Sequence, residues 1–169
     1  MTARGTTFLL AALAVLLAWL WLERPVPTRP STVPSFLTVG PDAVARLDLT
    51  ERGRRLTALR RDGDWVDETG QRWTDDAPVS LVATLGSIGP LMIVATDPAD
   101  PSEYGLGADA GRLELHATDG ATLLALDIGL RNPSTTGIYA RRAGQRDVLL
   151  VGAILAWELD KLRAAAPKG

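Results

Sequence analysis

The sequence predicts an α+β protein with a single N-terminal transmembrane helix, a proline-rich linker and one domain of antiparallel hairpins and helices. Three observations lead to this prediction. Residues 6–22 form an uncharged apolar run, several later segments alternate apolar with polar residues, and two segments repeat apolar residues at helical spacing. We expect a cytoplasmic segment over residues 1–5, the anchor over 6–22, the linker over 23–41 and a periplasmic domain over 42–166.

The apolar run from Thr6 to Leu22 is long enough to cross a bilayer with little tilt, since seventeen helical residues span roughly 25 Å. Trp19 and Trp21 near its end are typical of anchors at a membrane interface. A cleaved secretory signal is the alternative, because Arg4 also suits the basic start of a signal. The bulky residues from Ala18 to Leu22 offer no small-residue cleavage site, so we favour an uncleaved anchor.

The charges beside the anchor predict its orientation. Arg4 and the amino terminus precede the run, whereas Glu23, Arg24 and Arg29 follow it, and this balance favours a cytoplasmic N-terminus. We therefore expect a single-pass protein of the bacterial inner membrane with its C-terminal domain in the periplasm. The chain has no cysteine, which excludes disulfides and the acylated thiol of a lipoprotein.

Small side chains recur on one face of the predicted anchor. Ala11, Ala14 and Ala18 are spaced by three and four residues, and small residues let two membrane helices approach closely. These positions are candidate contacts with an integral membrane partner, beside the contact of the helix with lipid. The alternative is that alanine is simply common in this chain.

The linker over residues 23–41 contains five prolines, at 25, 27, 30, 34 and 41. Proline-rich chain favours the extended polyproline II helix, so the linker can hold the domain up to roughly 55 Å from the membrane. The apolar residues Phe36 to Val39 are expected to shorten this reach if they pack on the domain.

The first half of the domain reads as hairpins followed by a helix. Ala45, Leu47 and Leu49 alternate with polar residues, and residues 55–60 return as a second strand. Short strands are expected at residues 65–66 and 71–73, on either side of a turn. A helix over about 79–88 follows, in which we expect Asp75 or Asp76 to supply the N-cap, and residues 91–95 form an apolar strand.

The second half repeats this order after an irregular stretch over residues 97–111. Strands are expected at residues 112–117, 121–128, 136–142 and 146–151, and a helix at 153–165. Segments 43–95 and 111–165 therefore resemble two β-β-β-β-α units. The similarity lies in the order of elements and not in residue identity, so chance recurrence of hairpins is the alternative.

Composition excludes several function classes. Of 18 basic and 20 acidic residues, three arginines and one glutamate precede residue 40, so the domain carries a net charge of about −4. This charge argues against nucleic acid as a partner. Without cysteine, and with His116 as the only histidine, the sequence predicts no soft-metal site, no cofactor and no catalytic triad. We interpret His116 as a residue on the polar face of a strand.

Two other features have a functional and a structural interpretation. The acidic run from Asp62 to Glu68 faintly resembles a calcium loop but lacks its glycine and final glutamate, so a solvated turn is the better interpretation. Trp65, Trp73 and Trp157 could stack on a sugar, but three tryptophans in a domain of this size are more often part of its core.

Several motifs together resemble the domain of unknown function 4340 family. They are Trp65 after a hairpin, Tyr104-Gly105-Leu106 after the irregular stretch, Gly129 at a strand end and Tyr139 before an alanine. The resemblance covers about residues 43–162. Proteins of this family typically follow one N-terminal membrane span, and many are encoded beside components of gliding-motility-type ABC transporters. Many also continue into further copies of the domain, and this chain departs from them by being short.

The resemblance lends no catalytic residues, and the residues themselves form no reactive constellation. We therefore expect a non-enzymatic accessory subunit of an inner-membrane protein complex, with an ABC-type transporter as the candidate complex. A periplasmic binding module for envelope glycan or lipid is the alternative.

Overall fold

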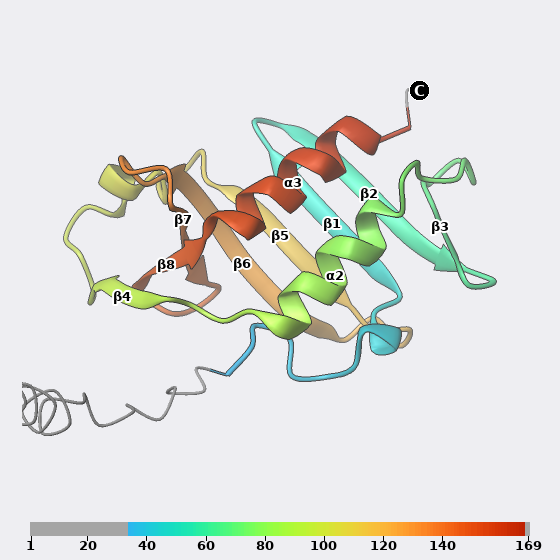
Figure 1. Ribbon diagram of the computed structural model, residues 1–169, viewed down its shortest axis with the longest axis horizontal. Helices are drawn as coiled ribbons and strands as arrows, with labels where there is room; N and C mark the ends of the chain where they lie inside the picture. The colour runs from blue at the N-terminus through green and yellow to red at the C-terminus, as the bar shows by residue number, and fades with distance from the viewer. Residues whose placement is uncertain (1–33, 168–169) are drawn as a thin grey trace, which may run out of the picture. The chain divides into compact units, whose positions relative to one another are not determined.

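The computed structural model describes residues 34–167, which form an α+β domain of two layers (Figure 1). One layer is an eight-stranded antiparallel sheet, and the other is a pair of helices that cover one face of it. The elements are η1 (Pro41–Ala43), β1 (Arg46–Glu51), β2 (Arg54–Arg61), β3 (Asp64–Val66), α2 (Ala77–Ser87), β4 (Met92–Ala95), η2 (Pro101–Tyr104), β5 (Gly111–His116), β6 (Thr122–Arg131), β7 (Gly137–Arg142), β8 (Val148–Gly152) and α3 (Ala153–Ala165).

The predicted anchor and the candidate contacts within it lie outside the described residues. Among residues 34–167 no helix has both the length and the apolar character that a membrane crossing requires.

The strand order is β3-β2-β1-β5-β6-β7-β8-β4, so the two halves of the domain meet at the β1–β5 pair. Leu49 lies opposite Leu113 and Leu47 opposite Leu115 in this antiparallel pair. The hairpins predicted at residues 112–128 and 136–151 are confirmed as β5–β6 and β7–β8. The helix predicted over residues 153–165 is confirmed as α3.

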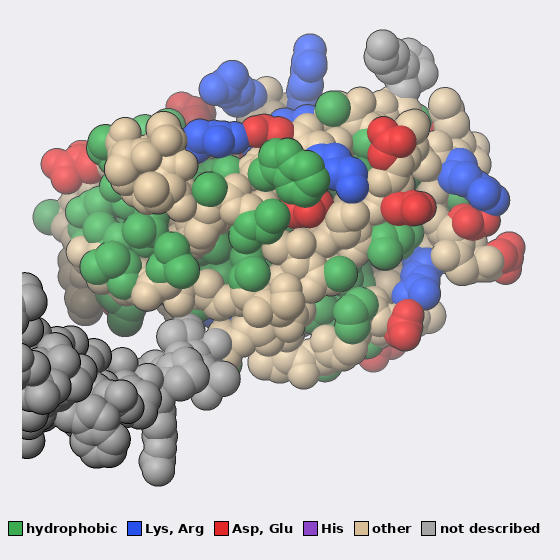
Figure 2. Space-filling view, viewed as in Figure 1, with side chains coloured by type: hydrophobic (Ala, Val, Ile, Leu, Met, Phe, Trp, Pro, Cys, Tyr) green, Lys and Arg blue, Asp and Glu red, His purple; other side chains and the backbone are tan. Residues whose placement is uncertain are grey.

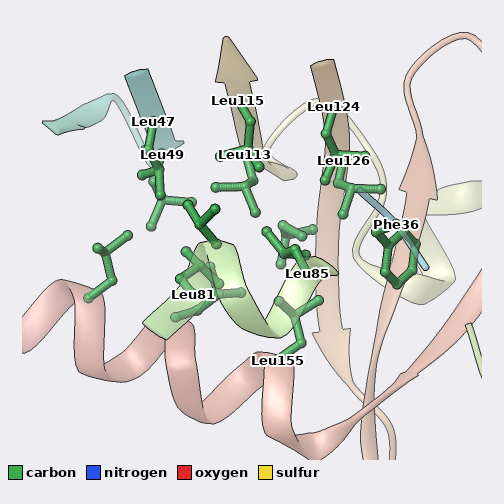
Figure 3. Packing of buried hydrophobic residues seen from close by; sticks show 14 of the residues in the cluster. Phe36, Leu47, Leu49, Leu81, Leu85, Leu113, Leu115, Leu124, Leu126 and Leu155 are labelled. Carbon is green, nitrogen blue, oxygen red and sulfur yellow. The ribbon is translucent and has the colours of Figure 1, made fainter. Parts of the chain in front are cut away.

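The core lies between the sheet and the two helices (Figure 3). Alternate residues of β1, β5 and β6 point toward the helices, which is the outcome expected when one face of a strand is buried. From the other side, α2 contributes Leu81 and Leu85, and α3 contributes Leu155, Leu159 and Leu162. The helices also pack against each other, so each closes one side of the same core.

The chain before the first strand also belongs to this core. Phe36 and Leu37 are almost completely buried, and their backbone N–H groups donate to the carbonyls of Ile88 (2.9 Å) and Leu85 (3.0 Å) at the end of α2. The guanidinium of Arg142 lies 5.1 Å from the centre of the Phe36 ring. The last part of the predicted linker is therefore part of the domain, and the domain begins before residue 42.

The structure refines some local predictions. Asp76 occupies the N-cap position of α2, as expected, but its side chain makes no cap hydrogen bond, because its φ of 45° differs from the extended backbone that a capping side chain needs. The strand expected at residues 71–73 shrinks to a single bridge between Val66 and Arg72. Val79 on α2 is 47% exposed, although its neighbours Ala77 and Pro78 in the same turn are buried.

Candidate functional site

The family-motif positions of the second half meet at one place. Tyr104 ends η2, and its ring meets the Tyr139 ring edge to face with centroids 5.1 Å apart. Leu106 follows Tyr104 and is 1% exposed. These contacts hold the irregular stretch after β4 against β6 and β7.

Two glycines make this close approach possible. Gly129 on β6 lies so near the backbone carbonyl of Tyr104 that an added Cβ would come within the 3.0 Å that real Cβ atoms avoid. Gly105 has a φ of +72°, which favours glycine, and a Cβ there would meet Leu130. The motif positions Tyr104, Gly105, Leu106, Gly129 and Tyr139 therefore form one packing cluster, which we call the tyrosine cluster.

The tryptophans do not share one environment. Trp65 (7% exposed) and Trp73 are buried in the core at the β3 edge, where the backbone N–H of Trp73 donates to the backbone carbonyl of Trp65 at 3.0 Å. Trp157 on α3 is 57% exposed, so its predicted place in the core was wrong. It faces away from the sheet on the helix side opposite Leu155 and Leu159, and the Lys161 ammonium lies 5.8 Å from the centre of its ring.

A buried carboxylate lies on the sheet face that the helices leave open. Asp48 belongs to the alternation predicted for the polar face, yet it is only 2% exposed. Its carboxylate accepts from Arg46 Nε (2.6 Å), Arg55 Nε (3.1 Å) and Thr57 Oγ1 (2.8 Å). Neighbouring strands thus cover this side chain, and their donors compensate for its burial.

The network around Asp48 also determines its protonation. Burial by itself would raise the pKa of this carboxyl, but hydrogen bonds from Arg46, Arg55 and Thr57 outweigh burial and hold the pKa below its ordinary value. Asp48 is therefore charged at neutral pH and contributes to the stability of the folded state there.

This shift predicts how acid weakens the domain. A folded-state pKa below the unfolded value of about 3.9 gives stability that is complete well above pH 4 and is lost as pH falls through the folded-state pKa. We expect Asp48→Asn to lower the free energy of unfolding by about 2 kcal/mol at pH 7, with the gap to wild type closing in strong acid. Urea titrations across this pH range measure the gap. The control is Asp42→Asn, whose side chain is 94% exposed; an equal loss in both variants contradicts this account.

His116 lies next to this network, on the polar face as predicted. Its Nε2 is 3.6 Å from Asp48 Oδ2 and 3.8 Å from Glu114 Oε2. A second network continues across the same face, in which Arg112 pairs with Glu114 and Asp127, and Asp127 also pairs with Arg141. The open face therefore carries two networks of ion pairs, with His116 between them.

The comparisons with known proteins identify the family. The family model described as "Domain of unknown function (DUF4340)" matches residues 74–165, which is more than half of the chain. This chain belongs to the DUF4340 family. The matched residues contain the tyrosine cluster but not Trp65. No curated protein and no solved structure matched the chain.

The DUF4340 domain leaves one edge of its sheet apolar and uncovered. β4 is the last strand in the order, and Leu91, Met92 and Ile93 are 62%, 57% and 54% exposed. Figure 2 shows hydrophobic side chains gathered on the side where Figure 1 places β4. We call residues 91–94 the β4 edge; sequence analysis predicted this strand, but not that it would be an edge.

The opposite edge is protected in the ways that are typical of soluble sheets. β3 has only three residues, its partner on the far side is the single Val66–Arg72 bridge, and Asp64 forms an ion pair with Arg72. The β4 edge, by contrast, exposes large apolar side chains, although β4 is also short and its pairing with β8 has a register shift between Ile93 and Ala95.

The predicted acidic turn behaves as a turn. Asp67 Oδ1 accepts from the N–H groups of Thr69 (2.9 Å) and Gln71 (2.8 Å), so this carboxylate closes the loop between β3 and Arg72. Over residues 34–167 the structure holds no cluster of three or more His, Asp or Glu side chains placed to bind a metal ion.

Proposed function

We propose that this DUF4340 chain is a non-enzymatic accessory subunit of an inner-membrane protein complex, with an ABC-type transporter as the candidate complex. The N-terminal run over residues 6–22 anchors it, and the domain lies in the periplasm. The observation that supports a role in binding another protein is the β4 edge, an uncharged and exposed strand at the end of a well-packed sheet.

The chemistry of the β4 edge indicates what its partner offers. The run from Gly89 to Thr96 has no charged residue, and the outer side of β4 has no strand beside it in the described domain. An extended segment can pair with such an edge through backbone hydrogen bonds, while its side chains cover the exposed apolar ones. The partner is therefore an extended, apolar segment of another subunit.

Co-purification from gently solubilised membranes tests this proposal. We expect a stoichiometric partner with the wild-type protein and its loss with Ile93→Lys, because the lysine would place a charge in the contact. Val79→Lys is the matched control, since Val79 is also exposed and apolar but lies on α2. A partner retained by both variants would exclude the β4 edge, and the absence of any partner would contradict the accessory role.

The proposed location has its own test. A reporter fused after Gly169 should be active only if it works outside the cytoplasm, because Arg4 precedes the anchor and the flanking charges favour a cytoplasmic N-terminus. Cytoplasmic activity of the same fusion would contradict the periplasmic location. A mature chain that begins near Glu23 would show that the run is cleaved.

Within the membrane, we propose that Ala11, Ala14 and Ala18 contact the same complex. Ala14→Leu should then release the partner while leaving membrane insertion intact. If Ala14→Leu keeps the partner, the helix is a tether and the β4 edge carries the contact.

We also propose that the domain is built from two similar β-β-β-β-α units. The chain order supports this, because β1 to β3 and the bridge at Arg72 precede α2, just as β5 to β8 precede α3. The antiparallel β1–β5 pair lies between the two sets of strands. Structures of longer members of the family would test it, since each further copy should show the same order.

Trp157 favours a second candidate function. An exposed tryptophan beside a lysine can stack on a sugar or rest at a lipid surface, as a binding module for envelope glycan or lipid requires. A purified monomer that retains such a small molecule, and loses it in Trp157→Ala, would support the binding module over the accessory subunit.

A further inference from the structure

We propose that a depression on the open face of the sheet binds a phosphate group. The depression has a volume of about 600 Å³ and lies between β1, β2 and the turn from β5 to β6, which is a size that suits a small ligand. It is separate from the β4 edge, because β1, β2 and β5 lie at the other end of the strand order. The inference therefore stands independently of the accessory role.

Asp48 fixes two arginines in the wall of this depression. The carboxylate pairs with Arg46 at 2.6 Å and with Arg55 at 3.1 Å, while the two arginine side chains are themselves 37% and 54% exposed. One negative charge thus holds two positive ones. Asp48 orients both guanidinium groups but balances only one of their two positive charges, so a net positive charge faces solvent.

One further arginine of the depression adds to this net positive charge. Arg61 has no ion-pair partner within residues 34–167, whereas Arg60 pairs with Asp42 outside the depression. Arg46, Arg55 and Arg61 remain against the carboxylates of Asp48 and Glu114, so one positive charge is in excess even with His116 neutral. The whole chain has a net charge of −2, which makes this surplus a local feature.

The donors in the wall favour phosphate over other ligands. Guanidinium groups only donate hydrogen bonds, and they come here from two strands, so they match a group with several acceptor oxygens. The lining includes no Trp, Tyr or Phe, which leaves a neutral sugar without an aromatic ring to stack on. A free phosphate compound and the headgroup of a phospholipid both carry the required chemistry.

Calorimetry on the full-length protein in dodecyl maltoside micelles tests the site with pyrophosphate as the probe. We expect saturable binding that Arg61→Ala weakens by about tenfold, because one charge-assisted contact is removed. Arg61 is exposed and has no ion-pair partner in the part of the chain that the structure describes, so this variant should keep its fold. Arg146→Ala is the control, since Arg146 is an exposed arginine that pairs with Asp97 outside the depression; it should bind as wild type does.

A second titration distinguishes the two sources of phosphate. Dioctanoyl phosphatidic acid is added to the same micelles, with dioctanoylglycerol as the control that lacks the phosphate. Binding of pyrophosphate identifies a site for free phosphate compounds, and binding of phosphatidic acid alone identifies a headgroup site. The proposal is overturned if neither probe binds in the millimolar range, or if Arg61→Ala and Arg146→Ala weaken binding equally.

Discussion

Replacing Trp65 by alanine should lower the free energy of unfolding by about 3–5 kcal/mol, the largest effect we expect from a single substitution. Trp65 is 7% exposed in the middle of β3 and belongs to the core cluster. Its removal leaves a cavity beneath a strand that has only three residues to pair with β2. Urea denaturation of a soluble fragment measures the loss; the fragment should begin at residue 33, so that Phe36 and Leu37 remain.

Trp157→Ala is the matched control for this experiment. The side chain is of the same type and lies in the same domain, but it is 57% exposed. We expect its removal to change stability by no more than about 0.5 kcal/mol. Equal losses in the two variants would contradict the core that the structure describes.

The second large effect is expected at the tyrosine cluster. Gly129→Ala should cost about 1–3 kcal/mol or more, because the new methyl group would press on the backbone carbonyl of Tyr104, which cannot rotate away as a side chain can. The contact between the Tyr104 and Tyr139 rings should loosen with it. Thermal unfolding and the near-ultraviolet circular dichroism of the tyrosines measure the two effects.

Gly86→Ala provides the contrast. Gly86 lies within α2, and an added Cβ there meets nothing within 4 Å. We expect this variant to gain up to about 1 kcal/mol, because alanine favours a helix more than glycine does. If Gly129→Ala is as well tolerated as Gly86→Ala, the close approach of η2 to β6 is not needed for the fold.

Local patterns in the sequence predicted most of the helices and strands, but not which strands lie side by side in the sheet. Alternation defined the β5–β6 and β7–β8 hairpins, and apolar spacing defined α3, because these signals depend on residues near one another in the chain. The pairing of β4 with β8 joins residues more than fifty positions apart, and no local signal encodes it. The exposure of the β4 edge therefore became visible only in the structure.

Local patterns also failed to predict which single residues on the polar face of the sheet are buried. Alternation correctly placed Asp48 away from the helices, but a polar position was assumed to be a solvated one. Its burial results from Arg55 and Thr57 on the neighbouring strand, and a pattern of period two carries no information about such cross-strand contacts. The depression beside it could not be predicted for the same reason.

The family resemblance singled out the motif positions but did not show what they do in the structure. Resemblance to the family singled out Tyr104, Gly105, Leu106, Gly129 and Tyr139, and the family match now covers all five. The structure explains them by packing, since the glycines allow η2 to reach β6 and the tyrosines hold it there. Their role is to build the domain, which leaves the β4 edge as the surface on which the proposed function rests.

Site-specific photo-cross-linking in living cells tests that surface most directly. A photoreactive amino acid replaces Ile93 on β4 in one strain and Val79 on α2 in a control strain; both positions are exposed. We predict a discrete cross-link to an integral membrane protein from position 93 and none from position 79. No cross-link from position 93, or the same products from both positions, would contradict the proposal that the β4 edge holds this subunit in its complex.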